Sequence, residues 1–307
     1  MAKGRSVWRC QGCGAMAPRW IGRCPDCGEF GTYVEEIQQA AGQASRGAAA
    51  VPSMALCDVS FDVEGRTATG VAEFDRACGG GLVKGSLLLI GGEPGIGKST
   101  LLLQVAAGLA GRGQKTLIVC GEESPAQVRL RADRLGVDGN LVRLLPEADI
   151  QRVEATVSAE RPDLLIIDSV QTAFDPDLDG AAGSVGQVRA VTARVMRMAK
   201  DDGVTTIIVG HVTKDGAIAG PRLLEHMVDC VLYFEGDRDN LLRIVRSVKN
   251  RFGASNEIGI FEMGEGGLSG VDQPSVALLS ARHSEVAGSA VAVALEGSRP
   301  LLVEVQA

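Results

Sequence analysis

Eight consecutive residues have the composition and spacing of a phosphate-binding loop. The segment Gly92-Glu93-Pro94-Gly95-Ile96-Gly97-Lys98-Ser99 follows a short apolar run and precedes a stretch with helical periodicity. In such a loop, backbone N–H groups freed by glycines point at the β-phosphate, and the following helix presents its positive end. The lysine reaches the β- and γ-phosphates, and the serine hydroxyl ligates Mg²⁺. The sequence therefore predicts an ATP and Mg²⁺ site from Gly92 to Ser99, with the adjacent Thr100 included.

Acidic residues follow two other apolar runs. Leu164-Leu165-Ile166-Ile167 ends at Asp168, and Glu122 and Glu123 come directly after the run 115–120. Because the second protein ligand of Mg²⁺ stands at the end of a neighbouring buried strand, Asp168 is the candidate. Hydrolysis also needs a group that orients and deprotonates the attacking water. Glu122 or Glu123 is the expected base, and the sequence leaves both open.

Four of the eight cysteines form two tight pairs near the N-terminus, Cys10-x-x-Cys13 and Cys24-x-x-Cys27. Four thiolates on two glycine- and proline-containing turns converge on one tetrahedral Zn²⁺ and leave no position for water. We therefore predict a structural zinc site that stabilises a module too small to build a core. Arg19, Trp20 and Arg23 lie between the pairs, where they offer a surface for DNA or protein, although simple packing of Trp20 fits equally well.

Bulk composition narrows the class of protein. The chain has 307 residues, 45% of them hydrophobic and 22% charged, as is ordinary for a folded soluble protein. No apolar run approaches the roughly 18 residues of a membrane helix, and no secretion signal precedes the cysteines, so we expect a cytoplasmic protein without a membrane partner. The net charge of −7 argues against coating nucleic acid by bulk charge. Any DNA contact must use local basic loops.

The residues around the phosphate loop predict a mainly parallel α/β sheet covered on both faces. Apolar runs alternate with amphipathic stretches between residues 52 and 271, with strands expected at 87–91, 115–120, 164–168 and 204–210 and helices at 99–110 and 125–135. The runs Met227 to Glu235 and Leu241 to Lys249 flank Gly236 to Asn240 and suggest an appended antiparallel hairpin. The expected organisation is a zinc finger at 1–34, a linker at 35–51 and an ATPase domain at 52–271.

Taken together, these motifs resemble the RadA (Sms) family of bacterial DNA repair proteins, which are RecA-like ATPases with an N-terminal four-cysteine zinc finger. The resemblance rests on the segment Pro18 to Pro25 around the cysteines, the phosphate loop, Gly121-Glu122-Glu123-Ser124 and Lys249-Asn250-Arg251-Phe252-Gly253, in this order. It implies a homohexameric ring on single-stranded DNA that hydrolyses ATP at subunit interfaces. It also implies branch migration or helicase-like processing of branched recombination intermediates, with a recombinase as partner.

The resemblance assigns roles to further residues. Lys249 and Arg251 would be catalytic cations that act on the nucleotide of the next subunit. Without the resemblance they would be interpreted as ordinary charges at the end of a strand. His211, at the end of a predicted strand, would sense the γ-phosphate and couple it to a DNA-binding loop. Loops at 175–187 and 213–222 would contact DNA phosphates, with Ser184, Arg189, Lys214 and Arg222 as the candidate residues.

Family members continue into a domain similar to the Lon protease fold. Residues 272–307 correspond to its start, so we expect a truncated segment with strands at 290–295 and 301–305. One alternative is a KaiC-like or other RecA-like regulatory ATPase that acts on protein partners; the cysteines and the Lys249 to Gly253 motif count against it. Another is a catalytically weak DNA-binding scaffold, which the set of Lys98, Asp168 and the two glutamates disfavours.

Overall fold

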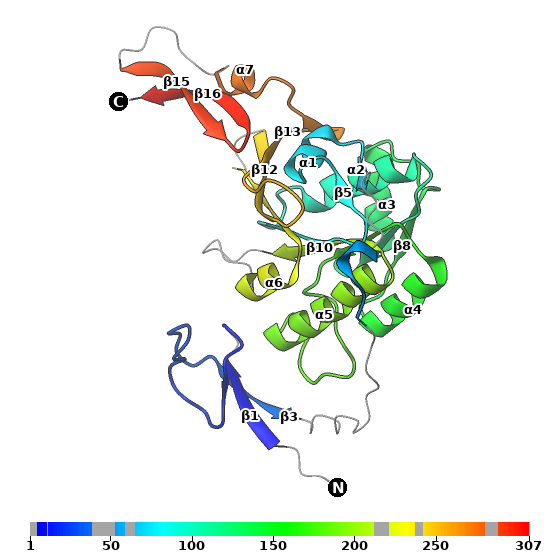
Figure 1. The fold of residues 1–307 in the computed structure, drawn as a ribbon, viewed down its shortest axis with the longest axis vertical. Helices are drawn as coiled ribbons and strands as arrows, with labels where there is room; N and C mark the ends of the chain where they lie inside the picture. The colour runs from blue at the N-terminus through cyan, green and yellow to red at the C-terminus, as the bar shows by residue number, and fades with distance from the viewer. Residues whose placement is uncertain are drawn as a thin grey trace.

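The fold is described by a computed structural model for residues 5–10, 12–38, 53–58, 65–211, 221–236, 242–279 and 288–306. The expected linker 35–51 lies outside the described residues from position 39 onward, as does the turn of the expected hairpin at 237–241. Figure 1 shows one large sheet with helices on both sides, a small strand module at the N-terminal end and a strand hairpin at the C-terminal end.

A nine-stranded sheet forms the centre of the described chain, in the order β14-β13-β12-β11-β6-β10-β9-β7-β8. The strands from β11 to β8 in this order run parallel, and β12, β13 and β14 extend the sheet with antiparallel pairings. The parallel strands are β6 (Leu87–Gly92), β7 (Thr116–Cys120), β8 (Val142–Leu145), β9 (Leu164–Asp168), β10 (Thr205–His211) and β11 (Cys230–Glu235). The antiparallel ones are β12 (Leu242–Asn250), β13 (Ile258–Gly264) and β14 (Gly267–Gly270).

The central strands are apolar throughout because both faces of the sheet are covered. Along β6, Leu88 and Ile90 pack with α1 (Ala72–Ala77), α2 (Lys98–Ala110) and α3 (Pro125–Arg134). Leu87 and Leu89 point to the other face, against α4 (Ile150–Glu160), α5 (Val185–Asp201) and α6 (Pro221–Met227). This alternation follows from the two-residue period of a strand. It produces two hydrophobic layers with the sheet between them.

Smaller elements flank this core. The N-terminal module is a three-stranded sheet of β1 (Arg5–Cys10), β2 (Met16–Ala17) and β3 (Tyr33–Gln38). A short 3₁₀ turn η1 (Leu56–Asp58) and the pair β4 (Arg66–Thr67) and β5 (Leu82–Val83) precede the large sheet. At the C-terminal end, α7 (Pro274–Leu279) is followed by the hairpin of β15 (Ser289–Glu296) and β16 (Arg299–Gln306). Leu301 of this hairpin packs on Ile258 and Ile260 of β13.

The expected fold class, a RecA-like core with a mainly parallel sheet, is confirmed, with one correction to the hairpin. The strands β11 and β12 pair antiparallel as expected, yet β11 also pairs in parallel with β6 and so belongs to the parallel core. It begins at Cys230, because residues up to Met227 form α6. The short strands β8, β13 and β14 escaped prediction since each mixes apolar with charged or glycine residues. No helix in the described part of the chain is both long enough and apolar enough to span a membrane.

Candidate nucleotide site and zinc centre

The phosphate loop connects the carboxyl end of β6 to the first turn of α2. Gly95 and Gly97 adopt φ angles of 80° and 119°, in the left-handed region that favours glycine. Gly97 is the residue before α2, and a Cβ atom built on it would lie 2.7 Å from the Cε atom of Met263. The backbone conformation therefore favours glycine at this position, and a larger residue would also displace the end of the Met263 side chain.

Lys98 lies inside the loop with only 5% of its surface exposed. Its Nζ donates to the carbonyl oxygens of Gly92 and Glu93, at 2.7 and 2.8 Å. Burial lowers the pKa of Lys98, and the carboxylates of Asp168 and Glu122 oppose that effect. The ammonium is thus held where the loop curves, within reach of a phosphate bound to the loop N–H groups.

Asp168 ends β9 and accepts a hydrogen bond from the hydroxyl of Ser99. Burial raises the pKa of Asp168, while the Ser99 hydrogen bond acts in the opposite direction. A hydroxyl and a carboxylate already in contact provide the hard oxygen ligands that Mg²⁺ prefers. The donor set therefore fits the expected ion.

Glu122 joins the ends of three neighbouring strands. Its Oε1 lies 2.6 Å from Nε2 of His211 at the end of β10, and it accepts a hydrogen bond from the hydroxyl of Ser169, just after β9. The hydrogen bond with His211 is the main cause that lowers the pKa of Glu122, with burial acting against it. Nδ1 of His211 is buried and has no hydrogen-bond partner among the residues that the structure describes.

Glu123 has a different environment from Glu122. Its carboxylate forms an ion pair with Arg131 of α3. Both glutamates line a cavity of about 330 Å³ together with Lys98, Ser99 and Asp168. Within that cavity the Glu122 carboxylate contacts a histidine and a hydroxyl, whereas the Glu123 carboxylate is neutralised by a guanidinium. Ser169 and Arg131 were not predicted from the sequence; Ser169 directly follows Asp168, and this adjacency was the available signal.

The predicted zinc ligands converge in the N-terminal module. The sulfur atoms of Cys10, Cys13, Cys24 and Cys27 all lie within 4.8 Å of one another. Two Sγ pairs are separated by 3.4 Å, for Cys13 and Cys24, and by 3.6 Å, for Cys10 and Cys27. A tetrahedron with Zn–S bonds of about 2.3 Å has edges of about 3.8 Å, so the cluster fits Zn²⁺.

The two cysteine turns repeat the same backbone geometry. The N–H of Gly14 donates to the carbonyl of Cys10 at 2.8 Å, and that of Gly28 donates to the carbonyl of Cys24 at 2.9 Å. Of the residues between the pairs, Trp20 is 52% exposed, so its indole is not part of the small core around Cys10, Cys24 and Tyr33. This favours a surface role for Trp20 over the packing role left open by the sequence.

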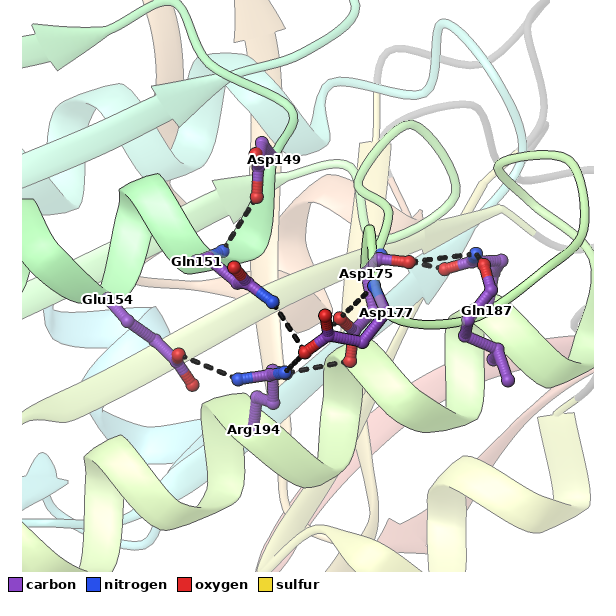
Figure 2. Close-up of polar contacts among 8 residues, drawn as sticks. Asp149, Gln151, Glu154, Asp175, Asp177, Gln187 and Arg194 are labelled. Atoms are coloured by element: carbon purple, nitrogen blue, oxygen red, sulfur yellow. Dashed lines mark hydrogen bonds and ion pairs between the residues drawn. The ribbon is translucent and has the colours of Figure 1, made fainter. Parts of the chain in front are cut away.

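The glycine-containing loop after β9 is bound to α4 and α5 by a polar network (Figure 2). Arg194 of α5 donates to both carboxylate oxygens of Asp175, at 2.7 and 3.2 Å, and to Oδ2 of Asp177 at 3.0 Å. Its third partner is Glu154 of α4, at 3.0 Å. Two acidic residues of this loop, Asp175 and Asp177, are therefore paired with Arg194.

Gln187 closes the same loop from the first turn of α5. Its side chain is 1% exposed, accepts from the N–H of Asp175 at 2.7 Å and donates to the carbonyl of Leu178 at 2.7 Å (Figure 2). Ser184 caps the N-terminus of α5, and Arg189 is exposed one turn further on. Of the other candidate DNA contacts, Lys214 and the side chain of Arg222 lie outside the described residues.

Lys249 and Arg251 lie at the opposite edge of the sheet from the phosphate loop of their own chain. Asn250 pairs with Cys230, which pairs with Leu88 near the start of β6, whereas the loop follows the end of β6. Lys249 Nζ donates to the carbonyls of Glu225 and Val228, at 2.6 and 2.8 Å. The structure thus brings Lys98, Ser99, Asp168, Glu122 and His211 together and places Lys249 and Arg251 apart from them.

Comparisons with known proteins agree with this architecture. Residues 62–217 match the family model of an AAA domain, and residues 8–35 match a rubredoxin metal binding domain. A KaiC-like protein from Pyrococcus horikoshii OT3, known from a crystal structure, shares the fold with a TM-score of 0.56 and 23% identity, over 67% of this chain and 98% of that one. At this identity the likeness concerns the fold alone.

Relatives at higher identity extend along the whole chain. The DNA repair protein RadA of Bacillus subtilis (strain 168) is 50% identical over 314 residues, which cover 100% of this chain and 68% of the relative. That of Brucella abortus (strain 2308) is 49% identical over 320 residues with the same coverage. The chain therefore belongs to the RadA family of DNA repair proteins and combines a RecA-like ATPase core with an N-terminal zinc ribbon.

Proposed function

We propose that this chain is a DNA-dependent ATPase that works as a ring on single-stranded DNA and promotes branch migration or helicase-like processing of recombination intermediates. The observation that carries the proposal is the placement of charged groups at both edges of one sheet. The phosphate loop follows the end of β6, and the Lys249 to Gly253 turn lies beside its start. Cations of that turn can meet a nucleotide only when a second chain supplies it.

Within one chain, the residues around the loop would divide the work of ATP hydrolysis. Lys98 would exchange the carbonyls of Gly92 and Glu93 for phosphate oxygens. Ser99 and Asp168 would hold Mg²⁺, which neutralises developing charge during phosphoryl transfer. Arg251 or Lys249 of the adjacent subunit would add a cation on the other side of the transferring group.

Glu122 is our candidate for the catalytic base. A general base must be ionised and must be able to contact the attacking water. The low pKa of Glu122, caused mainly by its hydrogen bond with His211, keeps the carboxylate ionised. The Glu123 carboxylate is instead engaged with Arg131. We assign Glu123 and Arg131 a supporting role in the wall of the cavity.

His211 would couple the nucleotide to DNA. Its ring contacts Glu122 through Nε2, and the chain continues from it into residues 212–220, where the second DNA-binding loop is expected. A change in the Glu122 to His211 hydrogen bond on ATP binding would therefore pass from the end of β10 into the loop that follows it. Ser184, Arg189, Lys214 and Arg222 are the proposed phosphate contacts, which would give salt-dependent and sequence-independent binding.

ATP turnover with and without single-stranded DNA tests this function, measured for the wild type, Lys98→Ala and Arg251→Ala. We expect DNA to stimulate the wild type, and we expect both variants to lose turnover. A wild type whose turnover ignores DNA while Lys98→Ala is inactive would refute the DNA motor and leave the ATPase. Turnover that survives Arg251→Ala would remove this residue from the catalytic set.

A further inference from the structure

The carboxylate of Asp229 lies at the base of the Lys249 to Gly253 turn and is 3% exposed. Its Oδ2 accepts from the N–H of Leu87 at 2.9 Å and from Nζ of Lys200 at 2.5 Å. Its Oδ1 lies 3.4 Å from Nη1 of Arg251. One buried anion therefore connects the first residue of β6, the end of α5 and the exposed turn.

Backbone hydrogen bonds reinforce this connection. The N–H of Arg251 donates to the carbonyl of Asp229 at 3.0 Å, and the N–H of Asp229 donates to the carbonyl of Leu87 at 2.9 Å. The main chain of the turn is thus anchored at the point from which the Asp229 carboxylate reaches the Arg251 side chain. Both the position and the direction of that side chain depend on residue 229.

The far side of the turn is also anchored. Asn250 accepts from the N–H of Phe252 at 2.9 Å through its Oδ1 and donates to the carbonyl of Cys78 at 3.1 Å. Arg66 donates to the carbonyls of Cys78 and Phe252. Lys200 contributes a second contact, because its ammonium lies 5.8 Å from the centre of the Phe252 ring. The turn is a platform fixed on two sides.

Arg251 combines this anchoring with exposure. The outer part of its side chain remains open, since 55% of its surface is accessible even though its guanidinium faces Asp229. Lys249 differs, because its ammonium is held by two carbonyls at the end of α6. Of the two cations in the motif, Arg251 is therefore the one presented outward, and a buried carboxylate sets its direction.

We propose that Asp229, together with Lys200, is a positioning pair that aims Arg251 at the nucleotide of the neighbouring subunit. This inference rests on the proposed action of Arg251 across a subunit interface. Asp229 contacts no nucleotide and acts through the turn. Alternatively, Asp229 could affect the phosphate loop of its own chain, because it also binds Leu87, from which β6 leads to that loop.

Mixed rings separate the two routes. A Lys98→Ala subunit has an inactive phosphate loop and an intact turn. An Asp229→Asn subunit has an intact phosphate loop and a turn whose Arg251 is no longer positioned. If Asp229 acts across the interface, the two variants are inactive when assayed separately and regain turnover in a 1:1 mixture. With random mixing of subunits, the turnover should reach about a quarter of the wild-type value. If Asp229 acts on its own loop, mixing restores nothing, and the proposal is wrong.

Control mixtures keep the outcome interpretable. Lys98→Ala mixed with Arg251→Ala tests the proposed function itself: recovery there without recovery for Asp229→Asn refutes only the positioning pair, and failure in both refutes the interface mechanism. Asp202→Asn removes an exposed aspartate at the end of α5 and should leave turnover at the wild-type level.

A second variant covers the case in which Asp229→Asn does not fold. Lys200→Met changes a side chain that is 44% exposed and removes both of its contacts, with Asp229 and with the Phe252 ring. We expect turnover to fall about tenfold, with an unchanged midpoint of thermal unfolding, and to recover in the mixture with Lys98→Ala. Wild-type turnover of Lys200→Met, or a loss that mixing leaves unchanged, would overturn the proposal.

Discussion

The two edges of the parallel sheet hold charged groups under different conditions. At the carboxyl edge, Lys98, Asp168 and Glu122 line a cavity of about 330 Å³, and all three have shifted pKa values. At the amino edge, Asp229 is neutralised within the chain by Lys200 and Arg251. The first arrangement leaves charges to be completed by a ligand, whereas the second uses paired charges to hold a turn.

This difference has a physical cause. The strand ends that carry the phosphate loop also direct backbone N–H groups of α2 outward, so anions are stabilised there. At the amino edge the buried Asp229 carboxylate is instead stabilised by one backbone N–H, that of Leu87, and by the cations of Lys200 and Arg251, since a buried charge must be paired to be tolerated. In the proposed function the carboxyl edge binds the nucleotide and the amino edge presents Arg251 to a neighbouring subunit, which is the division of roles that a shared site requires.

The largest effect should come from replacing the loop lysine. Lys98→Ala removes the cation that faces the phosphates, so we expect turnover to fall by about 10³-fold and nucleotide binding to weaken. Lys84→Ala, an exposed lysine at the amino edge, is the matched control and should leave both unchanged. Equal losses of turnover and nucleotide binding for the two lysine variants would contradict the functional difference between the two edges. Fluorescent nucleotide titration and phosphate release measure the two quantities.

Arg251→Ala should separate binding from chemistry. Since Arg251 lies far from its own phosphate loop, nucleotide affinity should stay within about twofold of wild type, and turnover should drop by about 10²- to 10³-fold. Lys115→Ala, an exposed lysine at the start of β7, serves as control. An equally large loss of nucleotide affinity for Arg251→Ala would contradict the proposal that the amino edge presents this residue to a neighbouring subunit.

The two glutamates allow a finer comparison within the carboxyl edge. Glu122→Gln should reduce turnover by about 10²-fold because the glutamine cannot accept a proton, while nucleotide affinity is retained. Glu123→Gln keeps most of the shape of the ion pair with Arg131 and should cost less than about tenfold. Single-turnover hydrolysis measures the chemical step. The reverse ranking would transfer the role of base to Glu123.

Arg194 tests the rigidity of the loop that follows β9. Arg194→Ala leaves Asp175 and Asp177 without their cation, so we expect about 1–3 kcal/mol less stability and faster amide exchange in residues 171–184. Arg197→Ala, an exposed arginine on the same helix, should change neither. Unaltered exchange after Arg194→Ala would show that the amide side chains of Gln187 and Gln151 hold the loop without the arginine. Hydrogen exchange read by mass spectrometry follows each segment.

The smallest expected effect concerns pH. The hydrogen bond from His211 is the main cause that lowers the pKa of Glu122, so the carboxylate stays ionised as pH falls below the usual range of a glutamate. His211→Ala removes this cause, and the acid limb of kcat/KM should move to higher pH by less than about one unit. The exposed His226 of α6 provides the control. An acid limb that does not move would show that His211 does not control the pKa of the catalytic base.

Much of the molecule could be predicted from local patterns. The continuous apolar runs of β6, β7, β9 and β10 predicted a parallel core because strands buried on both faces carry no polar alternation. The glycine spacing predicted the phosphate loop, and the paired cysteines predicted a metal cluster, since both depend on residues close together in the chain. The zinc ribbon and RecA-like fold followed with them.

Other features depend on contacts between distant segments and could not be predicted in this way. The sequence left Glu122 and Glu123 equivalent, and they differ only because His211 reaches one and Arg131 reaches the other. Arg194 belongs to no motif, and its ion-pair partners come from two other segments. Asp229 carried no motif at all, although it joins β6, α5 and the turn.

The division between the two kinds of feature follows from distance along the chain. Backbone conformation and ligand spacing are set by neighbouring residues, so the identity of the phosphate loop and of the zinc ligands was contained in the sequence. The partner of each charge is set by how strands are ordered in the sheet, which places Glu122 beside His211 and Asp229 beside Leu87. Only the tertiary structure could therefore decide which side chains gather around the phosphate loop and which hold the turn in place.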